Sequence, residues 1–294
     1  MSASNRWITA MLLTLLSWAS VRAQDAEEVI RVDTALVTVN VSVADAKGRR
    51  LSGLQAEDFR LTDEGQRMQL EFFDGQGPAS IVFVVDISSS MQGEKWKRLK
   101  AGLKKFLAKA RVDNDYTLIA FSDTPQLIVC SVNAAELWQN FSELKPSGNT
   151  ALYDAALLGL NTLERVPQRH KALVLLSDGV DTTSRAGLLQ VQQEALAHRA
   201  TIYTVGILYG FMEGVRKGQE LLNQLADATG GLVQFPALDE IREVLETIND
   251  DVGSQYSLSY YPPHKAPGWR QIQVSLAPET RHLNLRYQRR YLIR

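Results

Sequence analysis

Hydroxyl and carboxyl side chains stand at three places in the sequence where an apolar run stops or a helical pattern starts. The five residues are Asp86, Ser88, Ser90, Thr150 and Asp178. Asp86 follows the apolar run 81–85, Asp178 follows the run 172–177, and Thr150 precedes the helical pattern 151–165. Because ligands of a doubly wound sheet bind beyond the carboxyl ends of its strands, we expect these side chains to share one edge.

An oxygen cluster of this kind favours a small, hard cation. The carboxylate and two hydroxyls of Asp86-Ile-Ser88-Ser-Ser90 carry too little charge for a closed calcium cage. They suit Mg²⁺, which prefers octahedral oxygen ligands and keeps several waters, with Mn²⁺ or Ca²⁺ as possible substitutes. Alone, the pattern is also typical of serines that cap a helix. Thr150 and Asp178, at matching points of the chain, favour the metal site.

The middle of the chain alternates between strand and helix patterns. Continuous apolar runs predict buried strands, and apolar residues spaced three and four apart predict helices with one buried face. The expected strands are 81–85, 116–121, 126–132, 172–177, 201–207 and 232–235, and the expected helices are 94–111, 133–142, 151–165, 185–199, 218–229 and 238–251. This order predicts an α/β fold with a doubly wound, mostly parallel sheet.

The two flanking segments show the period-two alternation of half-buried strands, as at Val39 and Val41 near one end and Ile272 and Val274 near the other. Neither segment has enough strands to bury a face well by itself. We therefore expect one small β-sandwich, built from both segments, with the α/β domain inserted between them. The expected domains are 24–77 and 254–294 for the sandwich and 78–253 for the inserted domain.

The first 23 residues have the pattern of a secretory signal peptide. Arg6 precedes the apolar stretch 7–19, and Val21-Arg-Ala23 is a small-residue cleavage pattern. The apolar stretch is shorter than the roughly 20 residues of a transmembrane helix, although an N-terminal membrane anchor is the alternative. We expect a secreted or periplasmic protein with no transmembrane segment after cleavage.

Composition excludes several classes of protein. The 294 residues carry 32 Lys and Arg against 33 Asp and Glu, whereas nucleic-acid binding needs a basic surface. The many basic residues of the helix 94–111 are expected on its solvated outer face. The single cysteine, Cys130, cannot form an intramolecular disulfide, and its apolar neighbours 127–129 predict a buried, unreactive thiol.

The sequence has no arrangement typical of a catalytic site, so we expect the protein not to be an enzyme. A phosphatase-type Asp-x-Asp pair would need a second acid where Ser88 stands. None of the four histidines lies at a strand end with a Gly-x-Ser-x-Gly elbow, which a serine hydrolase would need. A phosphate-binding Gly-x4-Gly-Lys-Ser/Thr loop is also missing from the sequence.

Residues 80–252 resemble the von Willebrand factor A (VWA) domain with a metal-ion-dependent adhesion site (MIDAS). The segments that carry the resemblance are Val85-Asp86-Ile-Ser88-Ser-Ser90-Met91, Gly148-Asn-Thr150-Ala-Leu-Tyr-Asp154 and Leu176-Ser-Asp178-Gly179. The resemblance implies that the serine and threonine hydroxyls bind the metal and that the two aspartates act largely through water. It also implies that an acidic side chain of a partner protein fills the remaining position. The flanking segments resemble exported VWA-related proteins of acidobacteria.

The resulting hypothesis is an exported, adhesion-type module that captures an Asp or Glu of a partner protein through Mg²⁺. Phe211 and Met212 lie in a loop expected at the same edge and are candidate partner contacts, unless they pack against the helix 218–229. An alternative is a structural or assembly scaffold of the cell envelope whose metal stabilises the α/β domain. A metal-dependent hydrolase is the third interpretation.

Overall fold

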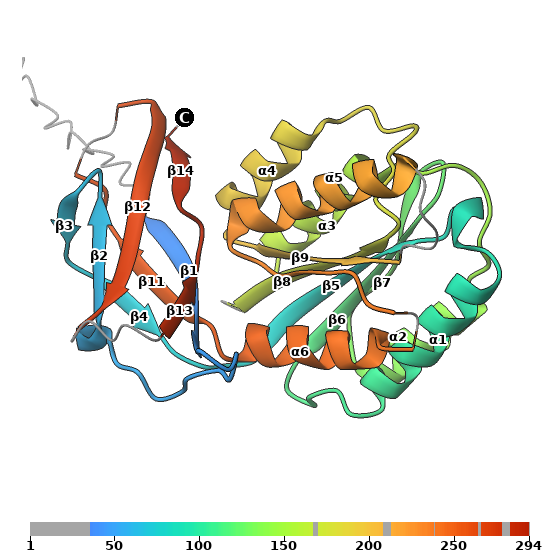
Figure 1. Ribbon diagram of the computed structural model, residues 1–294, viewed down its shortest axis with the longest axis horizontal. Helices are drawn as coiled ribbons and strands as arrows, with labels where there is room; N and C mark the ends of the chain where they lie inside the picture. Colours follow the sequence, from blue (N-terminus) through green and yellow to red (C-terminus); the bar gives the residue numbers. More distant parts are fainter. Residues whose placement is uncertain are drawn as a thin grey trace, which may run out of the picture. The chain divides into compact units, whose positions relative to one another are not determined.

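A computed structural model describes residues 36–166, 170–207, 213–237, 239–263, 266–277 and 283–293. The expected signal peptide lies outside the described residues. The described chain forms one six-stranded sheet with helices on both faces and two four-stranded antiparallel sheets (Figure 1).

The six-stranded sheet has the strand order β10-β9-β8-β5-β6-β7. Its strands are β5 (Ala79–Asp86), β6 (Asp115–Phe121), β7 (Pro125–Val132), β8 (His170–Ser177), β9 (Thr201–Gly206) and β10 (Val233–Gln234). Neighbouring strands are parallel except for β6 and β7, which are antiparallel. All residues of β5 are buried, because helices cover both faces of this central strand.

Helices lie on both faces of this sheet. They are α1 (Glu94–Leu107), α2 (Ala134–Glu143), α3 (Leu152–Glu164), α4 (Leu188–Ala197), α5 (Glu213–Thr229) and α6 (Ile241–Gly253). Successive residues of a strand point to opposite faces. Phe83 of β5 therefore packs in a cluster with Leu99 of α1 and Leu245 of α6, whereas Val84 packs in another with Leu160 of α3. The expected doubly wound, mostly parallel fold is confirmed.

The two antiparallel sheets have the orders β13-β1-β11-β4 and β14-β12-β2-β3. Their strands are β1 (Val37–Asp45), β2 (Phe59–Asp63), β3 (Gln66–Met68), β4 (Phe72–Asp74), β11 (Tyr256–Tyr260), β12 (Gly268–Leu276), β13 (Leu283–Arg286) and β14 (Arg290–Ile293). Each sheet pairs strands from before and after the six-stranded sheet, β1 with β11 and β2 with β12. This confirms the expected fold, in which the α/β part is inserted into a β-sandwich.

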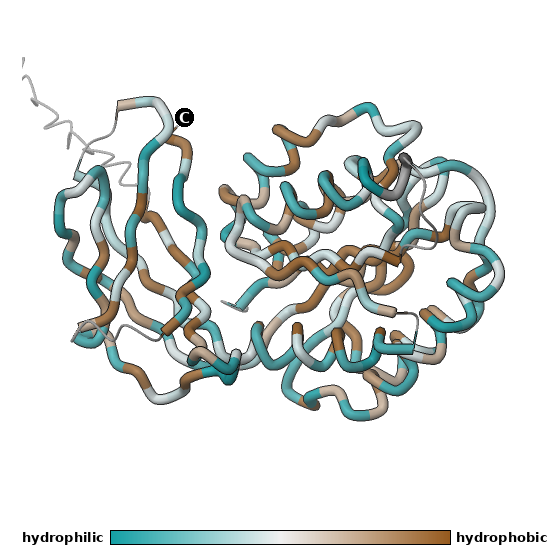
Figure 2. Tube along the Cα trace, in the orientation of Figure 1, coloured by the Kyte–Doolittle hydropathy of each residue, from teal (hydrophilic) through white to brown (hydrophobic). Residues whose placement is uncertain are grey.

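Apolar residues of both antiparallel sheets share one cluster, in which Val41 and Leu258 come from one sheet and Leu61 and Ile272 from the other. In the coloured part of Figure 2, apolar residues are concentrated on the strands, and polar residues are frequent on the outer sides of the helices. The period-two pattern predicted these strands because each sheet has one buried face. The strand β14 was not expected.

The prediction that Cys130 is buried is wrong, because its side chain is exposed. β7 is an edge strand that pairs only with β6 in the described sheet, and several of its residues are exposed. The pairing of β6 with β7 is irregular, and Ser131 has a φ of 51°. The apolar run 127–129 therefore led to a wrong prediction of burial, because an irregular edge strand of the sheet has fewer neighbours to cover it.

Within the described ranges, no helix is both long and apolar enough to cross a bilayer.

Candidate metal centre

The loop that follows β5 brings three of the predicted oxygen donors together. Asp86 is the last residue of β5, and both it and Ser88 are buried. The backbone N–H of Ser88 donates to Asp86 Oδ1 at 2.8 Å, and the hydroxyls of Ser88 and Ser90 lie 2.8 Å apart in a hydrogen bond. Met91, fully buried, anchors the end of the loop in the core. The loop therefore holds a carboxylate and two hydroxyls in a fixed arrangement.

A second loop carries Thr150, which is buried. Two backbone hydrogen bonds join it to the first loop, from Ser89 N–H to the carbonyl oxygen of Gly148 at 3.0 Å and from Ser147 N–H to that of Ile87 at 2.6 Å. Thr150 is itself held by Thr182, whose hydroxyl accepts from its N–H at 3.0 Å. Thr150 thus belongs to the same sheet edge as the two serines.

The third loop, after β8, is joined to Asp86 through Ser177. The Ser177 hydroxyl donates to Asp86 Oδ2 at 2.6 Å and accepts from the N–H of Gly179 at 3.0 Å. Asp178, between them, has a side chain that is 13% exposed. The carboxyl ends of the neighbouring strands β5 and β8 therefore place both aspartates at one edge, as the sequence predicted.

Burial dominates the electrostatics of this edge. It raises the pKa of Asp86 to about 6, and the negative charge of Asp178 adds to the effect, while hydrogen bonds from Ser177 and Ser88 oppose it. A buried carboxylate without a nearby positive charge binds its proton more tightly, because its ionised form has lost its hydration. A bound cation would supply the missing compensation.

The donor set fits a divalent cation that keeps part of its hydration. In the described part of the chain, no three His, Cys, Asp or Glu side chains gather where they could hold a metal ion. The predicted site has only two carboxylates, so hydroxyls and water must supply its other donors. Mg²⁺ tolerates such a set, whereas sites for Zn²⁺ are normally built from Cys, His and carboxylate ligands.

The structure also identifies supporting residues that sequence reasoning did not single out. Asp181 accepts hydrogen bonds from the N–H of Leu152 at 2.8 Å and the hydroxyl of Ser184 at 2.6 Å, at the start of α3. Asp123 accepts from the side-chain amide of Asn149 at 2.7 Å. Both carboxylates position the Thr150 loop. Their only sequence signal is that each lies shortly after a strand.

Lys95 is a third residue that the sequence did not place at the centre. Its Nζ lies 3.4 Å from Asp178 Oδ2 in a part-buried ion pair. We expected the basic residues of α1 on a solvated face, and Lys97, with 79% of its side chain exposed, lies there.

Phe211 and Met212, the candidate partner contacts, lie outside the described residues.

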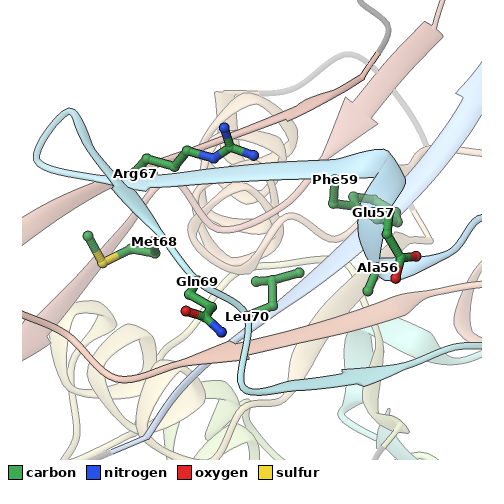
Figure 3. A pocket seen from close by; sticks show the side chains of 7 residues that line it. All are labelled: Ala56, Glu57, Phe59, Arg67, Met68, Gln69 and Leu70. Carbon is green, nitrogen blue, oxygen red and sulfur yellow. The ribbon is translucent and has the colours of Figure 1, made fainter.

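A pocket of about 660 Å³ lies in the antiparallel sheets, apart from the strand ends that carry the oxygen donors. Figure 3 shows the residues that line it, which come from the short 3-10 turn before β2, the first residue of β2, and the strand β3 and its exit: Ala56, Glu57, Phe59, Arg67, Met68, Gln69 and Leu70. Glu57 and Arg67 are its only charged residues, so it offers no cluster of metal ligands.

Comparison with known proteins agrees with the fold. Residues 80–250 match the family model of the von Willebrand factor type A domain. Inter-alpha-trypsin inhibitor heavy chain H3 of Bos taurus is 26% identical over 170 residues, which are 50% of this chain and 19% of that protein. Heavy chain H1 of Bos taurus is 30% identical over 143 residues, or 43% of this chain and 16% of that protein. The chain thus spans less than a fifth of the length of these relatives.

Two solved structures share the fold. The von Willebrand factor type A protein from Catenulispora acidiphila has a TM-score of 0.53 at 12% identity, covering 89% of this chain and 74% of that chain. Proximal thread matrix protein 1 from the mussel byssus has a TM-score of 0.50 at 18% identity, covering 63% of this chain and 48% of that chain. At these identities the likeness is one of fold.

Proposed function

The chain belongs to the von Willebrand factor type A family, and we propose that it is a protein-binding module in which a divalent cation captures an acidic side chain of a partner protein. The main support for the proposal is that Ser177, next to Asp178, donates a hydrogen bond to Asp86, while the hydroxyls of Ser88 and Ser90 are hydrogen bonded to each other. We propose Mg²⁺ as the cation, with Mn²⁺ or Ca²⁺ as substitutes.

Each residue has a distinct part in this proposal. The hydroxyls of Ser88, Ser90 and Thr150 would hold the cation directly, while Asp86 and Asp178 would act largely through water. Neutral hydroxyls leave the cation with more of its positive charge than direct carboxylate ligands would. When bound, the cation supplies a positive point charge that an Asp or Glu carboxylate can approach in a charge-assisted contact.

We propose that this module works outside the cytoplasm, as the signal-peptide pattern of residues 1–23 indicates, in the periplasm or as a secreted protein. We also propose that it is not an enzyme. The two described histidines have structural partners: His170 Nε2 is hydrogen bonded to the carbonyl oxygen of Gly75 at 2.8 Å, and His198 Nε2 lies 3.4 Å from Glu194. Neither supports the role of a catalytic base at the candidate metal centre.

The first experiment measures metal binding. Calorimetry and thermal unfolding of the purified protein are compared in Mg²⁺ and in chelator, for the wild type, Asp86→Ala and Asp113→Ala. Asp113 is an exposed aspartate paired with Arg111, so its loss is a matched control for the removal of one carboxylate. We expect Mg²⁺ to raise the melting temperature of the wild type and of Asp113→Ala but not of Asp86→Ala. A wild-type protein that binds no divalent cation contradicts the proposal.

The second experiment tests capture. The same three proteins are used to retain partners from envelope or extracellular extracts in Mg²⁺ and in chelator, and acidic residues of a retained partner are then replaced one at a time. We expect retention to need Mg²⁺, Asp86 and one acidic residue of the partner. If Asp86→Ala in chelator retains as much partner as the wild type does in Mg²⁺, capture through the cation is refuted. Metal-dependent stability without any metal-dependent partner would favour the scaffold alternative.

A further inference from the structure

Lys95 differs from the other basic residues of α1 in where its charge lies. Only 17% of its side chain is exposed, and its Nζ lies 3.4 Å from Asp178 Oδ2, a carboxylate that is itself 13% exposed. Lys97, two residues on, has 79% of its side chain exposed and lies 3.9 Å from Glu94. Lys104 and Lys105 are exposed as well, and Lys100, which is part-exposed, donates to the carbonyl oxygen of Ser142 at 2.6 Å. One lysine of this helix therefore turns toward the candidate metal centre.

The charge of Lys95 changes the electrostatic balance of the centre. The two carboxylates of Asp86 and Asp178 and one divalent cation cancel, so a centre made only of these groups is neutral. Lys95 leaves it with one net positive charge at a place partly shielded from water. Coulomb interactions at such partly buried positions are several times stronger than in bulk water. The charge of Lys95 therefore strengthens the binding of an anionic ligand. It weakens the binding of a cation, because the cation is repelled by Lys95 and competes with Lys95 for the Asp178 carboxylate.

We propose that Lys95 is a specificity-determining residue of the candidate metal centre: it weakens retention of the divalent cation and strengthens the binding of a carboxylate ligand to the loaded centre. The inference rests on the proposed function, because it assumes that a cation binds there. It adds to the cation a second source of positive charge for an anionic ligand, in a side chain of this chain that the family assignment does not single out. A lysine with a purely structural role would not change the two affinities in opposite directions.

The test uses Mn²⁺ and acetate as probes with the wild type, Lys95→Met and Lys97→Met. Met keeps the length of the lysine side chain and removes its charge, and Lys97→Met removes one charge from the same helix at an exposed site. Free Mn²⁺ is measured by electron paramagnetic resonance. Acetate binding is followed by the relaxation rate of water protons at protein in excess over Mn²⁺.

We expect Lys95→Met to bind Mn²⁺ about three- to tenfold more tightly than the wild type and acetate about tenfold more weakly, in line with the loss of one nearby charge. Lys97→Met should stay within about twofold of the wild type in both, because exposed charges are screened. Lys95→Arg, which keeps the charge, should also remain close to the wild type.

The outcomes separate this inference from the function on which it rests. If the wild type binds Mn²⁺ and Lys95→Met has Mn²⁺ and acetate affinities within twofold of it, only the role of Lys95 is overturned, and the proposed function stands. A wild type that binds no Mn²⁺ overturns both. Circular dichroism checks that each variant is folded, and Lys95→Gln replaces Lys95→Met if the latter is not. Equal changes in Lys95→Met and Lys97→Met would indicate a general charge effect and also count against the proposal.

Discussion

At the scale of one residue, the candidate metal centre places the carboxylate of Asp86 where its charge destabilises the fold. The carboxylate is fully buried, and two hydrogen bonds, from Ser177 and from the backbone of Ser88, do not compensate its lost hydration. The pKa is therefore raised to about 6. At neutral pH the metal-free protein carries a buried negative charge that destabilises its fold, and a bound cation would relieve it.

This cost predicts how stability without metal depends on pH. The folded pKa of about 6 lies above the ordinary 3.8, so the folded protein holds the Asp86 proton more tightly than the unfolded chain does. The contribution is fully present below about pH 4 and is lost as the pH rises through 6, by an amount on the order of 3 kcal/mol. In chelator, the free energy of unfolding of the wild type minus that of Asp86→Asn should fall across this window.

The measurement is denaturant unfolding at several pH values, with both proteins in the same buffers. Asn keeps the size of the side chain and removes the titration, so changes at other groups cancel in the difference. A difference that does not vary between pH 4 and pH 7 would contradict the raised pKa. With Mg²⁺ present at neutral pH, only the wild type should gain stability.

At the scale of elements, α5 meets the Asp178 loop through two glycines. Gly179 has a φ of 82°, a conformation that favours glycine, and an added Cβ there would lie 2.6 Å from the carbonyl oxygen of Gly218 in α5. A Cβ on Gly218 would lie 2.3 Å from the carbonyl oxygen of Asp178. Backbone therefore touches backbone at this point, and the helix fixes the position of the loop that carries Asp178.

We therefore expect Gly218→Ala to weaken both the fold and the metal centre. Alanine normally favours a helix over glycine by about 1 kcal/mol. Here its methyl group must displace a backbone carbonyl, so we expect a net loss of about 2 kcal/mol and weaker Mg²⁺ binding by calorimetry. Gly187→Ala is the control, since nothing lies within 4 Å of its added Cβ. A Gly218→Ala protein as stable as the wild type would show that the loop is not held by α5.

At the scale of the whole molecule, Asp251 of α6 joins the α/β part to the antiparallel sheets. It is fully buried and lies 2.8 Å from Arg50 and 2.6 Å from Arg286 of β13. Its Oδ2 also accepts hydrogen bonds from the hydroxyls of Tyr203 in β9, at 2.7 Å, and Ser42 in β1, at 3.2 Å. Residues from before and after the inserted part thus converge on one carboxylate of that part.

Breaking this network should uncouple the two parts. In Asp251→Ala, both arginines lose their buried partner, and removal of one member of a buried ion pair typically costs about 3–5 kcal/mol. We expect the wild type to unfold in one transition and Asp251→Ala in two. Single-tryptophan proteins can report each part, with Trp269 in β12 for the antiparallel sheets and Trp138 in α2 for the α/β part.

Asp250→Ala is the control for this substitution, because Asp250 is the neighbouring residue of α6 and is exposed. It should unfold like the wild type within about 0.5 kcal/mol. Coincident transitions of the two tryptophans in Asp251→Ala, at an unchanged denaturant midpoint, would show that the network does not couple the parts.

Much of the fold and the core of the candidate centre could be predicted from the sequence, because both depend on local patterns. Apolar runs and helical spacing are properties of neighbouring residues, and they predicted most of the helices and strands. Since parallel strands end at one edge, the alternation of strand and helix patterns was enough to predict that Asp86 and Asp178 share that edge. The metal, its ligand set and the domain bounds remain predictions.

Other features depend on contacts between residues far apart in the chain, which no local pattern describes. The rotation of α1 on the sheet decides that Lys95 meets Asp178 while Lys97 faces solvent. An irregular edge strand decides that Cys130 is exposed in spite of its apolar neighbours. No local pattern around Asp251 indicates a partner for it. The pairing of β1 with β13 brings Arg286 to its carboxylate. The sequence by itself determined which oxygen donors share an edge, and only tertiary packing decided which charges surround them, because charges interact through space rather than along the chain.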